Sequence, residues 1–297
     1  MLRLTSKFAL LFCSAVVVCA GSLISQAHAG LTLYGTAFSG APFDPNNNLS
    51  TLYQINQVGG AATAIGAIGD IGFKRVGAID FDSDGTLYGV GQRVSDNANV
   101  LITINRATGV GTEIGALGFL PNVQDISFRN GDGTLYAYSS SDIYTINKIS
   151  GLATHIGPTG EAEVGGALAF TAGDTLLKAG AGHLFTINQG TGAATSPLAL
   201  TYPFNPVTSS RANAMDFDYQ TGILWGSVAA GTSGSPANYL ATIDTATGLV
   251  TKVGNTVIGL DGLAAIPEPS TYGVFAGLAL VGIGMVNVAR RRKATAI

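Results

Sequence analysis

The chain has 297 residues, of which 46% are hydrophobic and only 11% are charged, and 41 are glycines. Residues 30 to 266 contain 17 acidic residues and nine lysines or arginines, a net charge of −8 without any basic cluster among aromatic residues, which argues against a nucleic-acid-binding protein. Abundant Gly, Thr, Ile and Tyr instead favour an all-β protein of short strands joined by tight turns.

The N-terminus has the three parts of a secretory signal peptide. Arg3 and Lys7 precede the apolar run Phe8–Ala20, and a small-x-small site ends at Ala29. The run is shorter than the roughly 20 residues that cross a bilayer, so we expect signal peptidase to cleave between Ala29 and Gly30. Cleavage would remove both cysteines of the chain, leaving an exported body without a disulfide or a thiolate.

The body contains five copies of a strand that ends in Ile-Asn or Ile-Asp. Successive isoleucines of this pattern are 49, 42, 41 and 56 residues apart. Each copy is followed by a turn with Gly, which supplies the positive φ of a tight hairpin, and then by another strand. The copies are Leu52–Asn56, Leu101–Asn105, Ile143–Asn147, Leu184–Asn188 and Leu240–Asp244.

A second hairpin precedes four of these copies, so each repeat predicts four short strands. Four-stranded units repeating every 40 to 50 residues are typical of a β-propeller, whose blades bury their faces by stacking around an axis. The preceding hairpins combine Ala78–Phe81 with Thr86–Gly89 and Asp125–Phe128 with Thr134–Tyr136, and weaker versions span residues 167–177 and 214–226.

The first copy has one strand too few. Leu33-Tyr34-Gly35 lacks a preceding strand, whereas Asp261–Ile266, after the last copy, resembles the missing one. We therefore predict a propeller of five four-stranded blades, closed by pairing of the N- and C-terminal strands. An open β-sandwich is the alternative fold.

The two histidines of the body do not form a predicted site. His155 falls on the expected outermost strand of its blade, and His183 on a turn before a core strand. Because these repeat positions are not equivalent, we interpret both as ordinary polar residues. We predict no catalytic residues and no cofactor.

One segment resembles half of a calcium-binding loop. Asp80, Asp82 and Asp84 alternate before Gly85, as in loops whose oxygen ligands face one ion. The twelfth position is Gly91 rather than a bidentate Glu, and Asp84-Gly85 equally suits a hairpin turn. We predict no metal site, and these three aspartates are the only calcium candidates.

Asp80 and Asp216 occupy the same position in the expected innermost strand and would both edge a central channel. Paired carboxylates can act as acid and base in glycan cleavage, but a role at the strand edge is favoured here. The longest insertions, residues 40–50 and 229–238, are candidate binding loops. Trp225 and the tyrosines of the second strands could stack on sugars, although we expect most of them in the core between blades.

The C-terminus carries three features in a fixed order. Pro267-Glu268-Pro269 precedes the apolar stretch Tyr272–Val288, and Arg290-Arg291-Arg292-Lys293 follows it. This tail resembles the PEP-CTERM sorting signal of bacterial exosortase substrates, and an ordinary C-terminal anchor is the alternative. The apolar stretch is a marginal transmembrane helix, and the basic cluster would keep the C-terminus cytoplasmic and the body outside. The resemblance implies cleavage by exosortase at or near Pro267-Glu268-Pro269.

These signals divide the chain into a signal peptide (residues 1–29), a propeller-like repeat body (30–266) and a sorting tail (267–297). The resemblance implies export across the inner membrane of a Gram-negative bacterium, transient membrane anchoring through the tail helix, and a final place at the cell surface or outside the cell. In layout the body resembles exported propellers of the NHL and WD-repeat kind, although no binding motif of theirs can be carried over.

We predict a noncatalytic surface or extracellular-matrix protein with a binding or structural role. The resemblance to exosortase substrates implies a link to biofilm, with exopolysaccharide or a matrix protein as candidate partners. A secreted hydrolase or lyase acting on polysaccharide is the alternative, and it would require His183, Asp80 and Asp216 to converge. A membrane-retained receptor, with its tail intact, is a third class.

Overall fold

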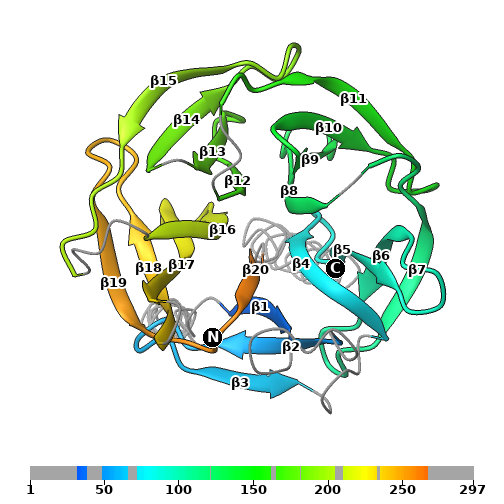
Figure 1. Ribbon diagram of the computed structural model, residues 1–297, viewed down its shortest axis with the longest axis horizontal. Helices are drawn as coiled ribbons and strands as arrows, with labels where there is room; N and C mark the ends of the chain where they lie inside the picture. Colours follow the sequence, from blue (N-terminus) through cyan, green and yellow to red (C-terminus); the bar gives the residue numbers. More distant parts are fainter. Residues whose placement is uncertain are drawn as a thin grey trace, which may run out of the picture. The chain divides into compact units, whose positions relative to one another are not determined.

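The repeat body is a closed ring of five blades, as predicted (Figure 1). The computed structural model describes residues 32–38, 49–65, 72–120, 122–161, 165–180, 182–204, 210–232 and 235–266. Within these residues, twenty strands form five four-stranded antiparallel sheets, and the innermost strand of each sheet faces the ring axis.

Each blade runs from an innermost strand outward. The innermost strands are β4 (Phe73–Phe81), β8 (Val123–Phe128), β12 (Ala167–Phe170), β16 (Arg211–Asp218) and β20 (Leu260–Ala265). The second strands are β1 (Leu33–Phe38), β5 (Leu87–Arg93), β9 (Leu135–Ser139), β13 (Leu176–Gly180) and β17 (Ile223–Thr232). The third strands are β2 (Ser50–Ile55), β6 (Asn99–Ile104), β10 (Asp142–Ile146), β14 (His183–Ile187) and β18 (Ser235–Ile243). The outermost strands are β3 (Ala62–Ile65), β7 (Gly111–Ala116), β11 (Ala153–Pro158), β15 (Ala194–Ala199) and β19 (Val250–Asn255).

The ring is closed by a blade assembled from both ends of the body. Its strand order is β20-β1-β2-β3, with Leu33 opposite Ala265 and Gly35 opposite Leu263. The C-terminal strand predicted from Asp261–Ile266 is therefore confirmed as β20. The other four blades each use four consecutive strands.

The recurring Ile-Asn and Ile-Asp pairs are explained by the turn that follows each third strand. In all five blades the Asn or Asp Oδ1 accepts hydrogen bonds from the backbone N–H groups two and three residues later, at 2.8–3.2 Å. This side chain replaces water as the acceptor and fixes the turn. The turn residues at positive φ are Gly60, Gly109, Gly151, Gly192 and Gly248.

The same five glycines also allow neighbouring blades to pack closely at the circumference. A Cβ atom at any of them would lie within 3.0 Å of backbone atoms of the preceding blade's outermost strand. Gly151, for example, lies against Gly115 of β7, and Gly192 against Gly157 of β11. Only a residue without a side chain permits this approach, so these positions need Gly for two reasons.

The core lies mainly between blades, where aromatic rings meet edge to face. Tyr88 in β5 contacts Phe128 of the next blade, and Tyr136 in β9 contacts Phe170, with ring centroids 5.2 Å apart in both pairs. Trp225 in β17 is also buried. The prediction that these residues belong to the core is therefore confirmed.

Two local predictions are wrong. Residues 229–238 are a hairpin rather than an inserted loop, because Ala229 pairs with Asn238 and Thr232 with Ser235, which extends β17 and β18. His183 is the first residue of β14 rather than part of a turn, because it pairs with Gly180. In both places the backbone ladder continues through residues whose types suggested a turn.

Candidate functional site

The innermost strands bring together a layer of five equivalent residues around the ring axis. Antiparallel pairing with the second strands places Asp80 opposite Tyr88, Ser127 opposite Tyr136 and Asp216 opposite Trp225. The remaining members of the layer are Ala169 and Ala264. The structure thus confirms that Asp80 and Asp216 share a repeat position.

Three polar side chains of this layer bind the backbone of the next blade. Asp80 Oδ2 accepts a hydrogen bond from the N–H of Phe128 at 2.7 Å. Ser127 Oγ accepts one from Phe170 at 3.0 Å, and Asp216 Oδ2 accepts one from Ala265 at 2.6 Å. Each bond joins one innermost strand to its neighbour and satisfies a buried backbone donor.

The two aspartates of the layer compensate for its two alanines. Ala169 and Ala264 offer no acceptor to the following blades, whose equivalent donors are the N–H groups of Phe217 and Phe81. Those N–H groups are instead bound at 2.7 Å by Oδ1 of the preceding residue, Asp216 and Asp80 respectively. Each aspartate therefore accepts two backbone hydrogen bonds, and all five equivalent donors are satisfied.

Asp125 makes a similar set of bonds two residues earlier along β8. It is fully buried, and its carboxyl group accepts N–H bonds from Ile126 (3.0 Å), Leu168 (2.8 Å) and Met215 (3.3 Å). The side chain thus joins three blades. Sequence reasoning missed it, although an aspartate where the other blades carry Ala78, Ala167, Ala214 and Gly262 was an available signal.

Burial raises the pKa of all three axial carboxyl groups. Loss of water is the largest cause for each. The pKa of Asp216 rises to about 7, and that of Asp80 rises well above its usual value because the negative charge of Asp216 adds to the effect of burial. The pKa of Asp125 is likewise raised, although three N–H donors oppose the rise.

A small cavity of about 30 Å³ opens beside this layer at one end of the axis. Its lining includes Asp80, Phe128 and Ala265 from innermost strands, with Ser83 and Tyr219 from the turns that follow β4 and β16. The pKa of Tyr219 is raised by burial and by the nearby carboxyl groups of Asp216 and Asp80. The cavity has room for a water molecule but not for a sugar ring.

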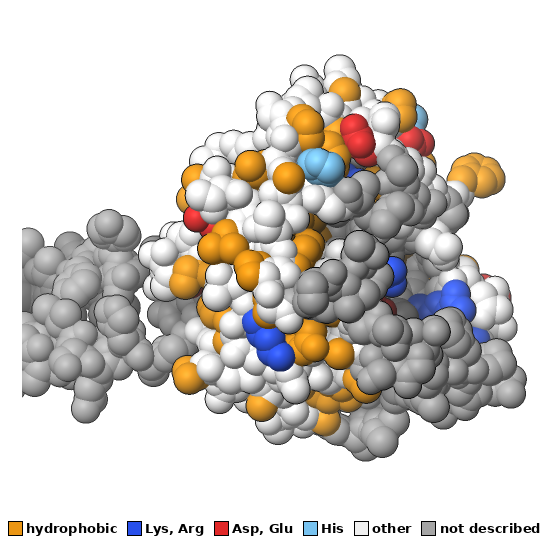
Figure 2. All heavy atoms as spheres, turned by 60° about the vertical axis from the view of Figure 1, so that its left-hand side comes forward, with side chains coloured by type: hydrophobic (Ala, Val, Ile, Leu, Met, Phe, Trp, Pro, Cys, Tyr) orange, Lys and Arg blue, Asp and Glu red, His pale blue; other side chains and the backbone are white. Residues whose placement is uncertain are grey.

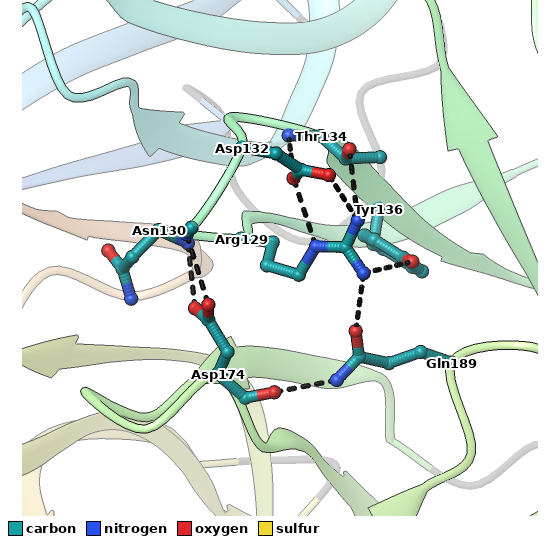
Figure 3. Close-up of polar contacts among 8 residues, drawn as sticks. Arg129, Asn130, Asp132, Thr134, Tyr136, Asp174 and Gln189 are labelled. Carbon is teal, nitrogen blue, oxygen red and sulfur yellow. Dashed lines mark hydrogen bonds and ion pairs between the residues drawn. The ribbon is translucent and has the colours of Figure 1, made fainter.

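A polar clasp holds the turns around this cavity in place (Figure 3). The Arg129 guanidinium forms an ion pair with Asp132 and donates to Gln189 Oε1 at 2.9 Å. The Asp174 carboxylate accepts N–H bonds from Asn130 (2.9 Å) and Gly131 (3.0 Å). Because Gln189 Nε2 donates to the Asp174 carbonyl oxygen at 2.6 Å, two turns of the β12–β15 blade are tied to a turn of the preceding blade.

The calcium candidates Asp80, Asp82 and Asp84 have separate roles. Asp80 binds strand backbone, whereas Asp82 Oδ1 accepts turn N–H bonds from Asp84 (3.1 Å) and Thr86 (3.0 Å). Asp84 itself is exposed. The part of the chain that the structure describes contains no group of three or more His, Cys, Asp or Glu side chains that could hold a metal ion.

The two histidines lie apart from the axial carboxyl groups. His155, on outermost strand β11, contacts Asp142 with 3.0 Å between Nε2 and Oδ2. His183 lies at the start of third strand β14, with its ring 5.7 Å from that of Phe185. The structure therefore does not bring His183 to Asp80 and Asp216.

A buried lysine was also missed by sequence reasoning. Lys178 in β13 is fully buried, and its Nζ lies 4.6 Å from the ring centroid of Tyr138. Among the described residues this Nζ has no hydrogen-bond partner, although the charge of Glu161 acts on it. The equivalent positions in the other blades are the small residues Gly35, Gly89, Ala137 and Gly226. Burial lowers the pKa of Lys178.

The side of the ring turned forward in Figure 2 shows apolar side chains scattered among backbone and other side chains, with few charges. Lys252 Nζ, on outermost strand β19, lies over the Tyr239 ring, 3.8 Å from its centroid, and Phe204 meets Tyr239 edge to face at 5.5 Å. Because the lysine already covers one face of the ring, Tyr239 is a poor sugar-stacking platform.

The predicted processing residues lie outside the described residues. These are Ala29 and Gly30 at the signal cleavage site, Pro267, Glu268 and Pro269, and the basic residues Arg290, Arg291, Arg292 and Lys293. The loop predicted at residues 40–50 is likewise described only from Leu49 onward. Among the residues that are described, we find no helix of the length and apolarity needed to cross a membrane.

Comparison with known proteins finds two matching families and a shared fold. The family described as "Repeat of unknown function (DUF6923)" matches residues 31–210, and the PEP-CTERM protein-sorting motif matches residues 265–293, which confirms the resemblance of the tail. No curated protein matches the chain.

Among solved structures, a chain of the nidogen/laminin complex is 11% identical, with a TM-score of 0.50 over 80% of this chain and 98% of that one. A protein from Lactobacillus plantarum is 12% identical, with a TM-score of 0.43 over 80% and 99%. A protein of unknown function from Bacteroides caccae is 12% identical, with a TM-score of 0.45 over 80% and 100%. At such identities, likeness shows the fold alone.

Proposed function

The chain belongs to the DUF6923 repeat family and its PEP-CTERM motif marks it as an exported, exosortase-sorted protein, and from this premise we propose that it acts as a noncatalytic binding or structural protein at the cell surface or in the extracellular matrix. The candidate partners are exopolysaccharide and matrix proteins. Transient anchoring by the tail would precede release or transfer.

One observation carries the noncatalytic part of this proposal. Asp80, Asp125 and Asp216, which are the natural candidates for acid–base chemistry, each bind the backbone N–H of a neighbouring innermost strand. A fourth carboxyl group, that of Asp261 in β20, accepts a hydrogen bond from Asn213 Nδ2 at 2.9 Å. A carboxyl group in such a bond cannot approach a substrate without breaking the contact between blades. This arrangement favours a rigid ring whose outer surfaces, rather than its axis, meet a partner.

A single specific observation favours the alternative, a polysaccharide hydrolase or lyase. Asp80 and Asp216 interact electrostatically, have raised pKa values, and Asp80 borders a cavity with Tyr219. Perturbed carboxyl groups of this kind occur at catalytic sites, although structural networks perturb them as well. The small volume of the cavity weighs against a sugar substrate.

Sedimentation with the host's matrix separates the two functions. We expect protein purified from the culture medium to co-sediment with exopolysaccharide isolated from the same host and to leave its chain length unchanged. Shortening of the polysaccharide that is lost in Asp80→Asn and Asp216→Asn variants would establish the enzyme. The binding function is overturned if the protein does not sediment with the exopolysaccharide or with matrix proteins and does not shorten the polysaccharide.

Intact mass tests the processing step. We expect the protein from the medium to begin at Gly30 and to end near Pro267-Glu268-Pro269, with the uncut tail present only in membranes. An intact tail in all mature protein would instead make this chain a membrane-retained envelope protein.

A further inference from the structure

The sorting motif begins where the ring ends. Strand β20 ends at Ala265, the residue at which the match to the PEP-CTERM motif starts. The next residue, Ile266, still donates a hydrogen bond to the Thr32 carbonyl oxygen at 3.3 Å. Pro269 is four residues beyond Ala265, so an extended chain places it at most ~14 Å from the end of the strand.

The chain leaves the ring near its centre rather than its edge. Strand β20 is an innermost strand, and Ala265 lines the axial cavity together with Asp80, Phe128 and Tyr219. The turns between innermost and second strands lie at this same end of the axis. These turns are residues 82–86, 129–134, 171–175 and 219–222, and we call the surface that they form the exit face.

The short connection prevents a peptidase from reaching the motif without touching the ring. A domain of about 235 residues has a radius of gyration of roughly 17 Å, which exceeds the ~14 Å between Ala265 and Pro269. From a central exit, any enzyme that holds Pro267-Glu268-Pro269 must lie against the turns on at least one side. We therefore propose that the exit face is a docking surface for the membrane-embedded exosortase.

The exit face is preformed for such a contact. Its turns are fixed by Asp82, by the Asp174 carboxylate and by the Arg129 clasp, all through hydrogen bonds within or between neighbouring blades. Rigid surfaces of this kind usually bind with little rearrangement.

The charge of the exit face favours a protein partner over lipid. Together with the last residue of β16, the four turns contain five aspartates and one arginine: Asp82, Asp84, Asp132, Asp174, Asp218 and Arg129. Asp82 and Asp218 are buried, Lys148 lies 3.7 Å from the Asp82 carboxylate, and Asp132 pairs with Arg129. The accessible negative charge therefore comes mainly from Asp84 and Asp174, and this small acidic excess does not attract anionic headgroups. This inference rests on the sorting motif and on the position of β20, and not on what the ring binds after processing.

A pair of single-cysteine variants tests the contact. Ser83 lies on the exit face, and Ser95 lies in the turn between β5 and β6, at the opposite end of the same blade; both are exposed. The natural cysteines, Cys13 and Cys19, fall in the predicted signal peptide, so each exported variant has one thiol. The full chain would be expressed in its host with a catalytically inactive exosortase and labelled with a benzophenone maleimide.

We expect illumination to link the Ser83→Cys variant to exosortase and to leave the Ser95→Cys variant unlinked. A 20-residue Gly/Ser linker inserted between Ile266 and Pro267 reaches about 25 Å, so the short connection no longer holds exosortase against the ring. Because a docking surface binds exosortase itself, we expect the adduct at position 83 to weaken but to remain stronger than the adduct at position 95. An adduct with lipid only, equal adducts at both positions, no adduct at position 83, or complete loss of that adduct with the linker would overturn the proposal.

Discussion

At the scale of single residues, the aspartates on the axis combine two opposing effects. Backbone N–H donors favour the carboxylate, whereas burial favours the protonated acid and is the larger effect. Between pH 3.8 and the raised pKa values, the folded ring therefore holds protons on these aspartates that the unfolded chain, with aspartate pKa values near 3.8, has released. Stability from these protons is complete below pH 3.8 and is lost as the pH rises through the folded pKa values.

We predict that the free energy of unfolding decreases between pH 4 and pH 7, and that Asp216→Asn flattens this decrease. The pKa of Asp216 is raised to about 7, so between pH 4 and pH 7 this residue holds a proton in the folded state that it releases on unfolding. The variant removes this difference and with it at most about 1.4 kcal/mol per pH unit of the slope. Urea unfolding at several pH values measures the slope. Asp84→Asn, at an exposed turn position, is the control and should keep it. An unchanged slope in Asp216→Asn would show that Asp216 is ionised throughout this range.

Lys178 gives a prediction of opposite sign. Its pKa is lowered by burial, so the fold disfavours the ammonium that exists at pH 7, and this penalty disappears only above the unfolded pKa of 10.5. We expect Lys178→Met to raise the free energy of unfolding by about 1–3 kcal/mol at pH 7, and by less at pH 11. Arg106→Met, which removes a positive charge at an exposed turn position, is the control. A destabilised Lys178→Met variant at pH 7 would mean that the ammonium is well solvated or paired.

At the scale of strands and turns, the glycine after each third strand has two requirements that can be separated by experiment. Gly151 has φ of 80° and lies against the Gly115 backbone of the preceding blade, whereas Gly85 has φ of 77° and no atom near the place of a Cβ. Both positions share the conformational requirement, and only Gly151 has the steric one.

We predict that Gly151→Ala is more destabilising than Gly85→Ala. Adopting a positive φ costs an alanine about 1–2 kcal/mol at either site, and the clash at Gly151 adds about 1–3 kcal/mol. The difference is measured as the shift in thermal midpoint, about 2–4 °C per kcal/mol for a domain of this size. Equal shifts would show that the blades separate at the circumference without penalty.

Most of the strands and turns could be predicted from the sequence because they recur at regular spacings. The Ile-Asn strands, their turns and the strand missing from the first blade all recur at matching spacings, and one strand pattern predicts the others. Asp125, Lys178 and the Arg129 clasp each occur in one blade only, so the repeat marks Asp125 and Lys178 as departures from small residues but does not predict their contacts. Their contacts join residues some 40 to 90 positions apart, which a single sequence does not pair. The hairpin at residues 229–238 was missed because Gly and Ser suggested a loop.

At the scale of the whole molecule, stability depends on the one blade that joins both ends of the body. Removing β20 leaves β1 with a free edge and removes Leu260 and Leu263, both fully buried. It also removes the Ala265 N–H that binds Asp216. The ring then lacks one innermost strand and cannot close.

We predict that a body ending at Ile266 folds cooperatively and that one ending at Gly259 does not. Loss of two buried leucines alone costs on the order of 4–10 kcal/mol, comparable to the whole stability of a domain. Urea unfolding and hydrogen exchange of β1 amides measure the effect. Protected β1 amides and an unchanged midpoint in the shorter body would show that four and three-quarter blades suffice.

The order in which the chain is made gives the closing strand a further consequence. Strand β1 is among the first parts of the body to be synthesised, and its partner β20 is the last. At roughly 5–20 residues per second, the intervening chain takes on the order of 10–50 s to produce. During that interval β1 keeps unpaired N–H and C=O groups along one edge, which can pair with another copy of the chain. A chaperone that binds the protein during export therefore has to cover this edge of β1 until β20 has been made and can pair with it.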